Sequence, residues 1–334
     1  MNAPRPEKPR VSDTPAAAGF ARRSIAASLR ESTWTAADGQ VLRRIDGAGK
    51  APSRGALLFL PGRGDCYEKY LETLGQWQAA GWDVTALDWR GQAGSGRAGL
   101  DALTGHVDDF AVWVADLAAF WREWRAGSPG PHVLVAHSMG GHLALRAVAE
   151  GAVDPRALVL SAPMLGLHGL GLPTRVLGRF ARIMAALGDP RRPAWRDSEK
   201  PGAHFATRMR LLTHDAARYA DEDFWRAARP ELAMGPASWG WVRAALDSIA
   251  RLDAPGVLEA VTIPVLLLGT RCDRLVRYRA IARAAARLPH GELLTFGREC
   301  RHEVLREVDP VRARALQAID EFLDRTAPRR QPAA

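Results

Sequence analysis

Cysteine is scarce in this chain of 334 residues, which has only Cys66, Cys272 and Cys300. Three widely spaced cysteines do not build a disulfide framework, so we expect a reducing compartment and a cytoplasmic protein. Long apolar runs are also missing, and none approaches the roughly 18 residues of a membrane-spanning helix. The N-terminal residues lack the apolar segment of a secretory signal as well.

Lysine is almost absent, with four lysines beside 42 arginines, and the formal net charge is +9. An arginine excess spread along the whole chain is typical of a composition bias. No zinc-ligand spacing and no aromatic-plus-basic RNA motif accompanies it, so we expect no nucleic-acid partner. A cationic surface does attract anionic membranes, and peripheral contact with the inner face of a membrane is therefore one prediction.

Hydrophobic residues are plentiful at 47% of the chain, which is enough for a sizeable core. Short apolar runs that predict buried strands alternate with amphipathic runs that predict helices. The predicted strands cover residues 55–62, 82–89, 132–138, 157–163, 261–269 and 292–296, and the predicted helices cover 68–81, 106–127, the run after Ser138, 278–288 and 303–325. This alternation predicts a mostly parallel central sheet flanked by helices.

One block interrupts the alternation. Residues 165–250 contain glycine-rich turns, helical runs and four tryptophans, but no convincing strand. An all-helical insertion at this point would lie above the carboxyl ends of the strands, where open α/β sheets bind ligands. We therefore predict a helical cap at 165–250 within an α/β core of 33–164 and 251–326, with disordered ends at 1–32 and 327–334.

The pentapeptide AHSMG places Ser138 between a predicted strand and a predicted helix. A nucleophile at such an elbow sits on a strained turn, and bulky residues two positions before or after it would collide as the chain folds back. Ala136 and Gly140 satisfy this requirement. Because glycine is more usual at the first of these positions, the turn must accommodate one extra methyl group. Ser138 is the candidate nucleophile.

A serine nucleophile needs a general base, and the base needs an acid that holds its tautomer. In this architecture the three follow along the chain in the order serine, acid, histidine. Asp273 and His302 each come just after a predicted strand, so the fold would bring both to the rim that carries Ser138. Asp253 precedes the strand that it would have to follow, and the other histidines lack this placement.

Acyl transfer also needs two preorganised N–H donors for the oxyanion. One is the backbone N–H of Met139, which follows the nucleophile. The second comes from the turn after the strand at 55–62, where by position it is the backbone N–H of Arg63. Gly62 lets the backbone approach closely there. The mechanism requires neither a metal nor an organic cofactor.

Six motifs in order resemble the α/β-hydrolase superfamily, in its branch of bacterial lysophospholipases and monoacylglycerol lipases. These motifs are LPGRGDCYEKY, DWRGQAGSGR, GHVDDF, AHSMGGH, GTRCDRLV and RHEVLRE, and the resemblance spans residues 33–325. It implies the α/β-hydrolase fold and supports the triad and oxyanion assignments. The family commonly has His-Gly where this chain has Pro61-Gly62, a difference that leaves the backbone donor in place.

The resemblance and the apolar cap together imply hydrolysis of a single-acyl lipid ester, a lysophospholipid or a monoacylglycerol, through an acyl-Ser138 intermediate. A short-chain carboxylesterase or a serine aminopeptidase would use the same triad, and both alternatives stay open. A dehalogenase or an epoxide hydrolase would need aspartate at the elbow. A non-enzymatic binding protein on the same scaffold is an alternative of another class. The oligomeric state stays open.

Overall fold

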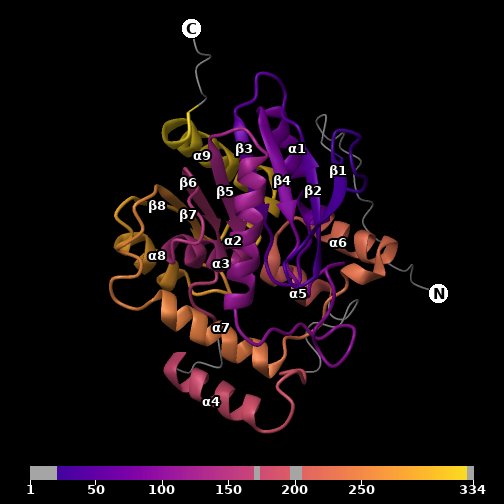
Figure 1. Ribbon diagram of the computed structural model, residues 1–334, viewed down its shortest axis with the longest axis vertical. Coiled ribbons are helices and arrows are strands. Elements are labelled where there is room, and N and C mark those ends of the chain that lie inside the picture. The colour runs from indigo at the N-terminus through magenta and orange to yellow at the C-terminus, as the bar shows by residue number, and fades with distance from the viewer. Residues whose placement is uncertain (1–20, 169–173, 196–204, 329–334) are drawn as a thin grey trace, which may run out of the picture.

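One eight-stranded sheet organises the described residues of the computed structural model, which are 21–168, 174–195 and 205–328. The order of its strands is β1-β2-β4-β3-β5-β6-β7-β8 (Figure 1). They are β1 (Arg30–Thr35), β2 (Val41–Gly47), β3 (Gly55–Leu60), β4 (Trp82–Leu87), β5 (His132–His137), β6 (Ala157–Ser161), β7 (Val265–Thr270) and β8 (Gly291–Phe296). The strands from β4 to β8 pair in parallel, which confirms the predicted fold class.

Helices cover both faces of this sheet. Those assigned in the described residues are α1 (Leu71–Ala79), α2 (Ala111–Ala126), α3 (Ser138–Ala149), α4 (Thr174–Ala186), α5 (Phe205–Leu212), α6 (Ala216–Ala228), α7 (Trp239–Leu252), α8 (Tyr278–Arg287) and α9 (Asp309–Thr326). Helices α2 and α3 pack against each other. Helix α9 lies against α1, and the Arg312 guanidinium of α9 donates hydrogen bonds to Thr73 and Gln76 of α1.

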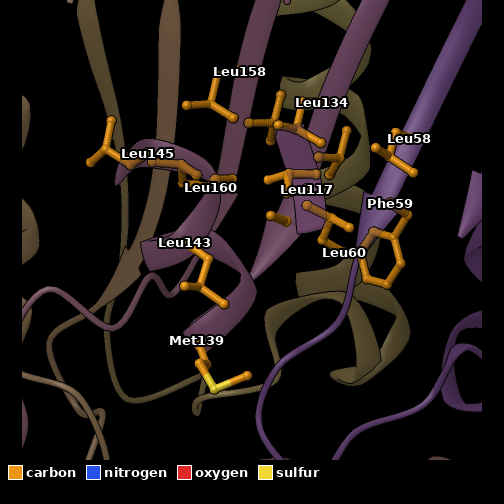
Figure 2. Packing of buried hydrophobic residues seen from close by; sticks show 14 of the residues in the cluster. Leu58, Phe59, Leu60, Leu117, Leu134, Met139, Leu143, Leu145, Leu158 and Leu160 are labelled. Atoms are coloured by element: carbon orange, nitrogen blue, oxygen red, sulfur yellow. The ribbon is translucent and has the colours of Figure 1, made fainter. Parts of the chain in front are cut away.

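The centre of the sheet is buried on both faces. Every residue of β3, β6 and β7 is buried, which explains why these strands read as unbroken apolar runs instead of alternating patterns. Figure 2 shows Leu58 of β3, Leu134 of β5 and Leu160 of β6 packed together with Leu143 of α3. This core supports the carboxyl ends of the strands, where the predicted site residues lie.

The antiparallel strands β1 and β2 at the sheet edge were not predicted. Four of the first five residues of β1 are solvent-exposed, so its sequence has no apolar pattern, and its backbone pairing with β2 holds it in place. The predicted disordered arm at 1–32 is therefore wrong for residues 30–32. Residues 21–29 also make contacts, since Trp225 Nε1 donates to the Arg22 carbonyl over 2.9 Å. Residues 1–20 lie outside the described residues.

The C-terminal tail differs slightly from the prediction. Ala327 is buried, and its N–H donates to the Leu323 carbonyl over 2.8 Å, so it still belongs to the end of α9 and not to a disordered tail. Residues 329–334 lie outside the described residues.

Helices α4 to α7 lie between β6 and β7 in the chain, where the sequence predicts the insertion. The described part of 165–250 contains helices and isolated bridges but no strand. Helix α4 packs on α7, and the Phe180 ring meets the Trp239 ring edge-on with centroids 5.6 Å apart. Figure 1 shows these two helices beyond the end of the sheet, on the side opposite the C-terminus.

Candidate active site

The turn between β5 and α3 holds Ser138 in a strained conformation. Its φ is 50°, in the left-handed region that non-glycine residues rarely occupy. A Cβ added to Gly140 would lie 2.3 Å from the carbonyl oxygen of Pro61, so the small residue there lets α3 pass close to the end of β3. Ala136 is fully buried, and its methyl group is accommodated. The local geometry is that of a nucleophile elbow.

Ser138, His302 and Asp273 form one chain of hydrogen bonds. The His302 Nε2 atom lies 2.9 Å from Ser138 Oγ, and Nδ1 lies 2.7 Å from Asp273 Oδ2. The other carboxylate oxygen, Asp273 Oδ1, accepts the backbone N–H groups of Leu275 and Val276 over 2.7 and 2.9 Å. The structure thus brings together three side chains that are 164 and 29 residues apart in sequence.

The charges within this chain prepare His302 to act as a general base. Burial alone would lower the pKa of His302, but the neighbouring Asp273 carboxylate outweighs burial and raises the pKa above 6.5. Burial would raise the pKa of Asp273, yet the His302 imidazole and two backbone N–H groups lower it below 3.8. Asp273 therefore stays ionised and accepts a hydrogen bond from the Nδ1–H group, which leaves the Nε2 lone pair of neutral His302 facing Ser138.

The predicted oxyanion donors lie on two turns beside Ser138. Met139 is the second residue of α3, so its N–H has no acceptor within the helix and lies at the positive end of the helix dipole. On the other side, a Cβ added to Gly62 would lie 3.1 Å from Ser138 Cβ, which shows how closely the turn that carries Arg63 approaches. The donor roles of Arg63 and Met139 remain predictions.

Two side chains brace that turn, and sequence reasoning missed both. Asp65 Oδ2 accepts the N–H of Gly62 over 3.2 Å, and Gln92 Oε1 accepts the N–H of Gly64 over 2.7 Å. Gln92 belongs to the motif DWRGQAGSGR, which is one of the six motifs of the family resemblance but was given no role in the site. Both side chains are buried, so the turn is held from beneath.

The Arg63 side chain points to the insertion between β6 and β7. Its guanidinium lies over the rings of Trp241 and Trp195, at 5.2 and 5.9 Å from their centroids. It also donates to the Gly235 carbonyl over 2.7 Å. Contacts of this kind fix the position of the insertion relative to the predicted oxyanion turn.

A buried lysine joins the site loops from below. Lys69 Nζ contacts Asp65 of the predicted oxyanion turn, Glu303 beside His302 at 2.7 Å, and Glu222 of α6 at 3.2 Å. Burial would lower the pKa of Lys69, but the three carboxylates outweigh burial and raise it. Only the pair Asp65 and Lys69, four residues apart, could have been noticed in the sequence, because the other partners come from distant segments.

His137, which precedes the nucleophile, does not join the triad. Its ring is buried, and its centroid lies 4.9 Å from that of His302. Burial, followed by the proximity of His302, lowers its pKa to about 4. The ring is therefore neutral near pH 7, and Nδ1 donates to the Ser161 carbonyl over 3.1 Å.

The family model described as serine aminopeptidase, S33, matches residues 51–309. The chain belongs to the α/β-hydrolase superfamily. This α/β hydrolase is 31% identical to lysophospholipase L2 of Escherichia coli over 284 residues, which cover 80% of each chain. The resemblance stated from the motifs is confirmed.

Solved structures share the fold of this chain. A soluble variant of the monoglyceride lipase from Saccharomyces cerevisiae matches this α/β hydrolase with a TM-score of 0.71 and 17% identity, over 92% of this chain and 99% of the lipase. The monoacylglycerol lipase of Paleococcus ferrophilus matches with a TM-score of 0.65 and 19% identity, over 84% and 98%. At such identities the likeness establishes the fold alone.

In the described part of this α/β hydrolase, no helix combines the length and the apolar character that a bilayer span requires. Nor do three or more His, Cys, Asp or Glu side chains gather there in a group suited to a metal ion. The absence of a cofactor remains a prediction.

Proposed function

We propose that this protein is a serine hydrolase that cleaves the carboxylic ester of a single-acyl lipid, either a lysophospholipid or a monoacylglycerol. The observation that carries the proposal is the hydrogen-bonded chain of Ser138, His302 and Asp273 at a strained elbow. The similarity to lysophospholipase L2 supports the substrate class. An intact triad also argues against a non-enzymatic binding protein.

The reaction proceeds by acyl transfer in two halves. Ser138 Oγ attacks the ester carbonyl carbon while His302 Nε2 takes the hydroxyl proton, and Asp273 stabilises the imidazolium that forms. The backbone N–H groups of Met139 and Arg63 hold the oxyanion of the tetrahedral intermediate. His302 then gives its proton to the departing glycerol oxygen, which leaves an acyl-Ser138 ester.

The second half returns the enzyme to its starting state. A water molecule attacks the acyl-Ser138 carbonyl carbon while His302 Nε2 removes a proton from the water. Collapse of the second tetrahedral intermediate breaks the bond to Ser138 Oγ. His302 returns its proton to that oxygen, and the fatty acid leaves.

The helical insertion acts in this proposal as a cap over the acyl chain. We assign residues 165–250 to the cap and residues 33–164 and 251–326 to the core. Trp195 and Trp241 support the assignment, because both contact the side chain of Arg63, whose backbone is a predicted oxyanion donor. Large apolar side chains beside the predicted oxyanion turn suit a hydrocarbon chain better than a charged peptide.

A serine aminopeptidase is the second candidate, and the description of the family model favours it. Recognition of a free amino terminus calls for an available carboxylate near the nucleophile. Asp65 and Glu303, which adjoin the predicted oxyanion turn and His302, are already paired with Lys69. Their charges are thus compensated within the protein, and the ester hydrolase is the better supported of the two.

The test is a substrate panel with purified protein. It comprises lysophospholipids, monoacylglycerols, p-nitrophenyl esters of increasing chain length and aminoacyl p-nitroanilides. We expect the highest kcat/KM on the single-acyl lipids, and Ser138→Ala should lower kcat by about four to six orders of magnitude.

The matched control is Ser161→Ala, at the end of the neighbouring strand β6. The hydroxyl of Ser161 is buried and has no hydrogen-bond partner among the described residues, so this variant should retain activity. Release of p-nitroaniline without lipid hydrolysis would instead assign the protein to the aminopeptidases.

A further inference from the structure

Helix α4 carries a stripe of large apolar side chains that face solvent. Four of the eight large hydrophobic residues that are exposed in the described part of the chain lie on α4 and its last turn. They are Val176, Phe180, Ile183 and Leu187, which are 47, 44, 56 and 63% exposed. Their spacing of four, three and four residues places all of them along one line of the helix.

The opposite face of α4 is the one that packs against the protein. Gly178, Ala181 and Ala185 are buried, and α4 contacts α7. The partly exposed Phe180 ring also meets the Trp239 ring of α7 with its edge. An ordinary surface helix buries its large apolar residues and exposes polar ones, whereas α4 buries small residues and exposes large ones. The fold therefore leaves much of the apolar stripe exposed to solvent. An exposed apolar patch of this kind marks an interaction surface.

Arginines flank the stripe. Residues 174–195 include five arginines and a single acidic residue, Asp189. At about 100° per residue, Arg179 falls along one edge of the stripe, and Arg182 falls farther round on the same side, toward the face that packs on α7. Both are exposed, and Arg182 pairs with Asp247 over 2.5 Å, whereas Arg179 has no carboxylate partner among the described residues. An apolar stripe with guanidinium groups along its edge complements an anionic lipid surface.

The stripe lies on the side of the molecule that carries the candidate active site. Helix α4 packs on α7, and α7 packs on α3, which begins at Ser138. Figure 1 shows α4 as the outermost element beyond α7, away from the strands. A flat surface that meets α4 would face the insertion and the carboxyl ends of the strands.

We propose that α4 docks this protein on an anionic bilayer, with Val176, Phe180, Ile183 and Leu187 in the interfacial region and the flanking arginines on lipid phosphates. A second copy of the chain fits the stripe less well. A two-fold contact through α4 would bring the arginine edges of both copies to the same interface without added acidic groups. The proposal that this protein docks on a bilayer depends only on the surface of α4. The further idea that docking brings lipid substrate to Ser138 rests on the proposed function.

The test is flotation of the full-length protein with vesicles of ether-linked phosphatidylcholine and phosphatidylglycerol, which contain no ester. Binding should rise with the phosphatidylglycerol fraction and fall with salt. The variant Ile183→Ser/Leu187→Ser should lower the partition coefficient at least about tenfold, and Arg179→Gln about fivefold. These side chains are among the most exposed on the stripe, so the variants should fold, which circular dichroism checks.

The matched control is Val41→Ser/Val112→Ser, which removes two apolar side chains of 44 and 39% exposure from β2 and α2. It should bind vesicles as the wild type does. Failure of the wild type to bind, or equal binding by the stripe variant, would overturn the proposal. So would a dimer in sedimentation that the stripe variant abolishes without vesicle binding. Ser138→Ala should bind normally, which separates docking from the proposed hydrolysis.

Discussion

At the scale of single residues, the conformation of Ser138 shows how the site is prepared. A φ of 50° costs a non-glycine residue about 1–3 kcal/mol, so neighbouring contacts must hold it. The N–H of Met164 donates to the Ser138 carbonyl over 2.9 Å, and the tight passage of Gly140 under Pro61 fixes the start of α3. The hydroxyl is thereby aimed at His302 before any substrate binds.

The acid limb of the pH profile should report the pKa of His302. Protonated imidazole cannot accept the Ser138 proton, so kcat/KM should fall as the pH drops through this pKa. Because Asp273 raises the pKa, the midpoint should lie above pH 6.5. Asp273→Asn should move the midpoint to lower pH and reduce kcat by about 10⁴-fold. Initial rates on a water-soluble p-nitrophenyl ester measure both quantities.

The control for this profile is His290→Gln, which changes an exposed histidine outside the triad. Its acid limb should coincide with that of the wild type. An acid limb that stays at the wild-type pH in Asp273→Asn would contradict the pairing of Asp273 with His302.

At the scale of elements, the junction between β3 and α3 depends on one missing side chain. In Gly140→Ala, the new Cβ would lie 2.3 Å from the Pro61 oxygen and 2.7 Å from the Leu60 oxygen, both backbone atoms that cannot turn aside. We expect the free energy of unfolding to fall by at least about 1–3 kcal/mol. Urea denaturation measures the change.

A matched glycine in α4 provides the comparison. A Cβ added to Gly178 meets nothing within 4 Å, so Gly178→Ala should stabilise the protein by about 0.5–1 kcal/mol through helix propensity alone. Equal stability of the two alanine variants would show that the elbow does not need the close approach of Gly140 to the backbone of Leu60 and Pro61.

The elements that the sequence predicted best are those with a clear apolar pattern, either an unbroken run or a helical period. Strands such as β3 are buried on both faces and therefore read as apolar runs, and the small residue at 140 marks the elbow. Strand β1 was missed because backbone pairing alone defines it. The last helix was predicted from 303, but α9 begins at Asp309 after a short 3₁₀ turn at Val304–Arg306.

The candidate triad could be predicted because the order of strands fixes which loops meet at one edge of the sheet. The support beneath it could not be predicted in the same way. Glu303 reaches Lys69 across 234 positions, and nothing in the local sequence of either residue identifies the other. Such pairs follow from the packing of the loops, which a periodic pattern does not describe.

At the scale of the whole molecule, Lys69 joins the core to the helical insertion. Its ammonium group compensates three buried carboxylates, those of Asp65, Glu303 and Glu222. Lys69→Met would leave them with less positive charge nearby, and removal of one partner from a buried ion pair costs about 3–5 kcal/mol. We expect a loss of this size in urea denaturation, and Lys50→Met, on an exposed loop, should cost little.

The same cluster predicts how stability changes with pH. Burial would raise the three pKa values, but Lys69 and nearby arginines lower them, from 3.8 for Asp65 and from 4.5 for Glu222 and Glu303, to about 2. Carboxylates with lowered pKa values stabilise the fold above their ordinary pKa, and this stability is lost as the pH falls. The free energy of unfolding should therefore decline between about pH 4.5 and 2 in the wild type. An equally steep decline in Lys69→Met would contradict the assignment.

The most direct test of the proposed chemistry is mass spectrometry of the protein quenched in acid during turnover of a lysophospholipid. We expect a covalent adduct with the mass of the acyl chain on the peptide that contains Ser138, and its absence in Ser138→Ala. An adduct on another residue, or undiminished lipid hydrolysis by Ser138→Ala, would contradict the account.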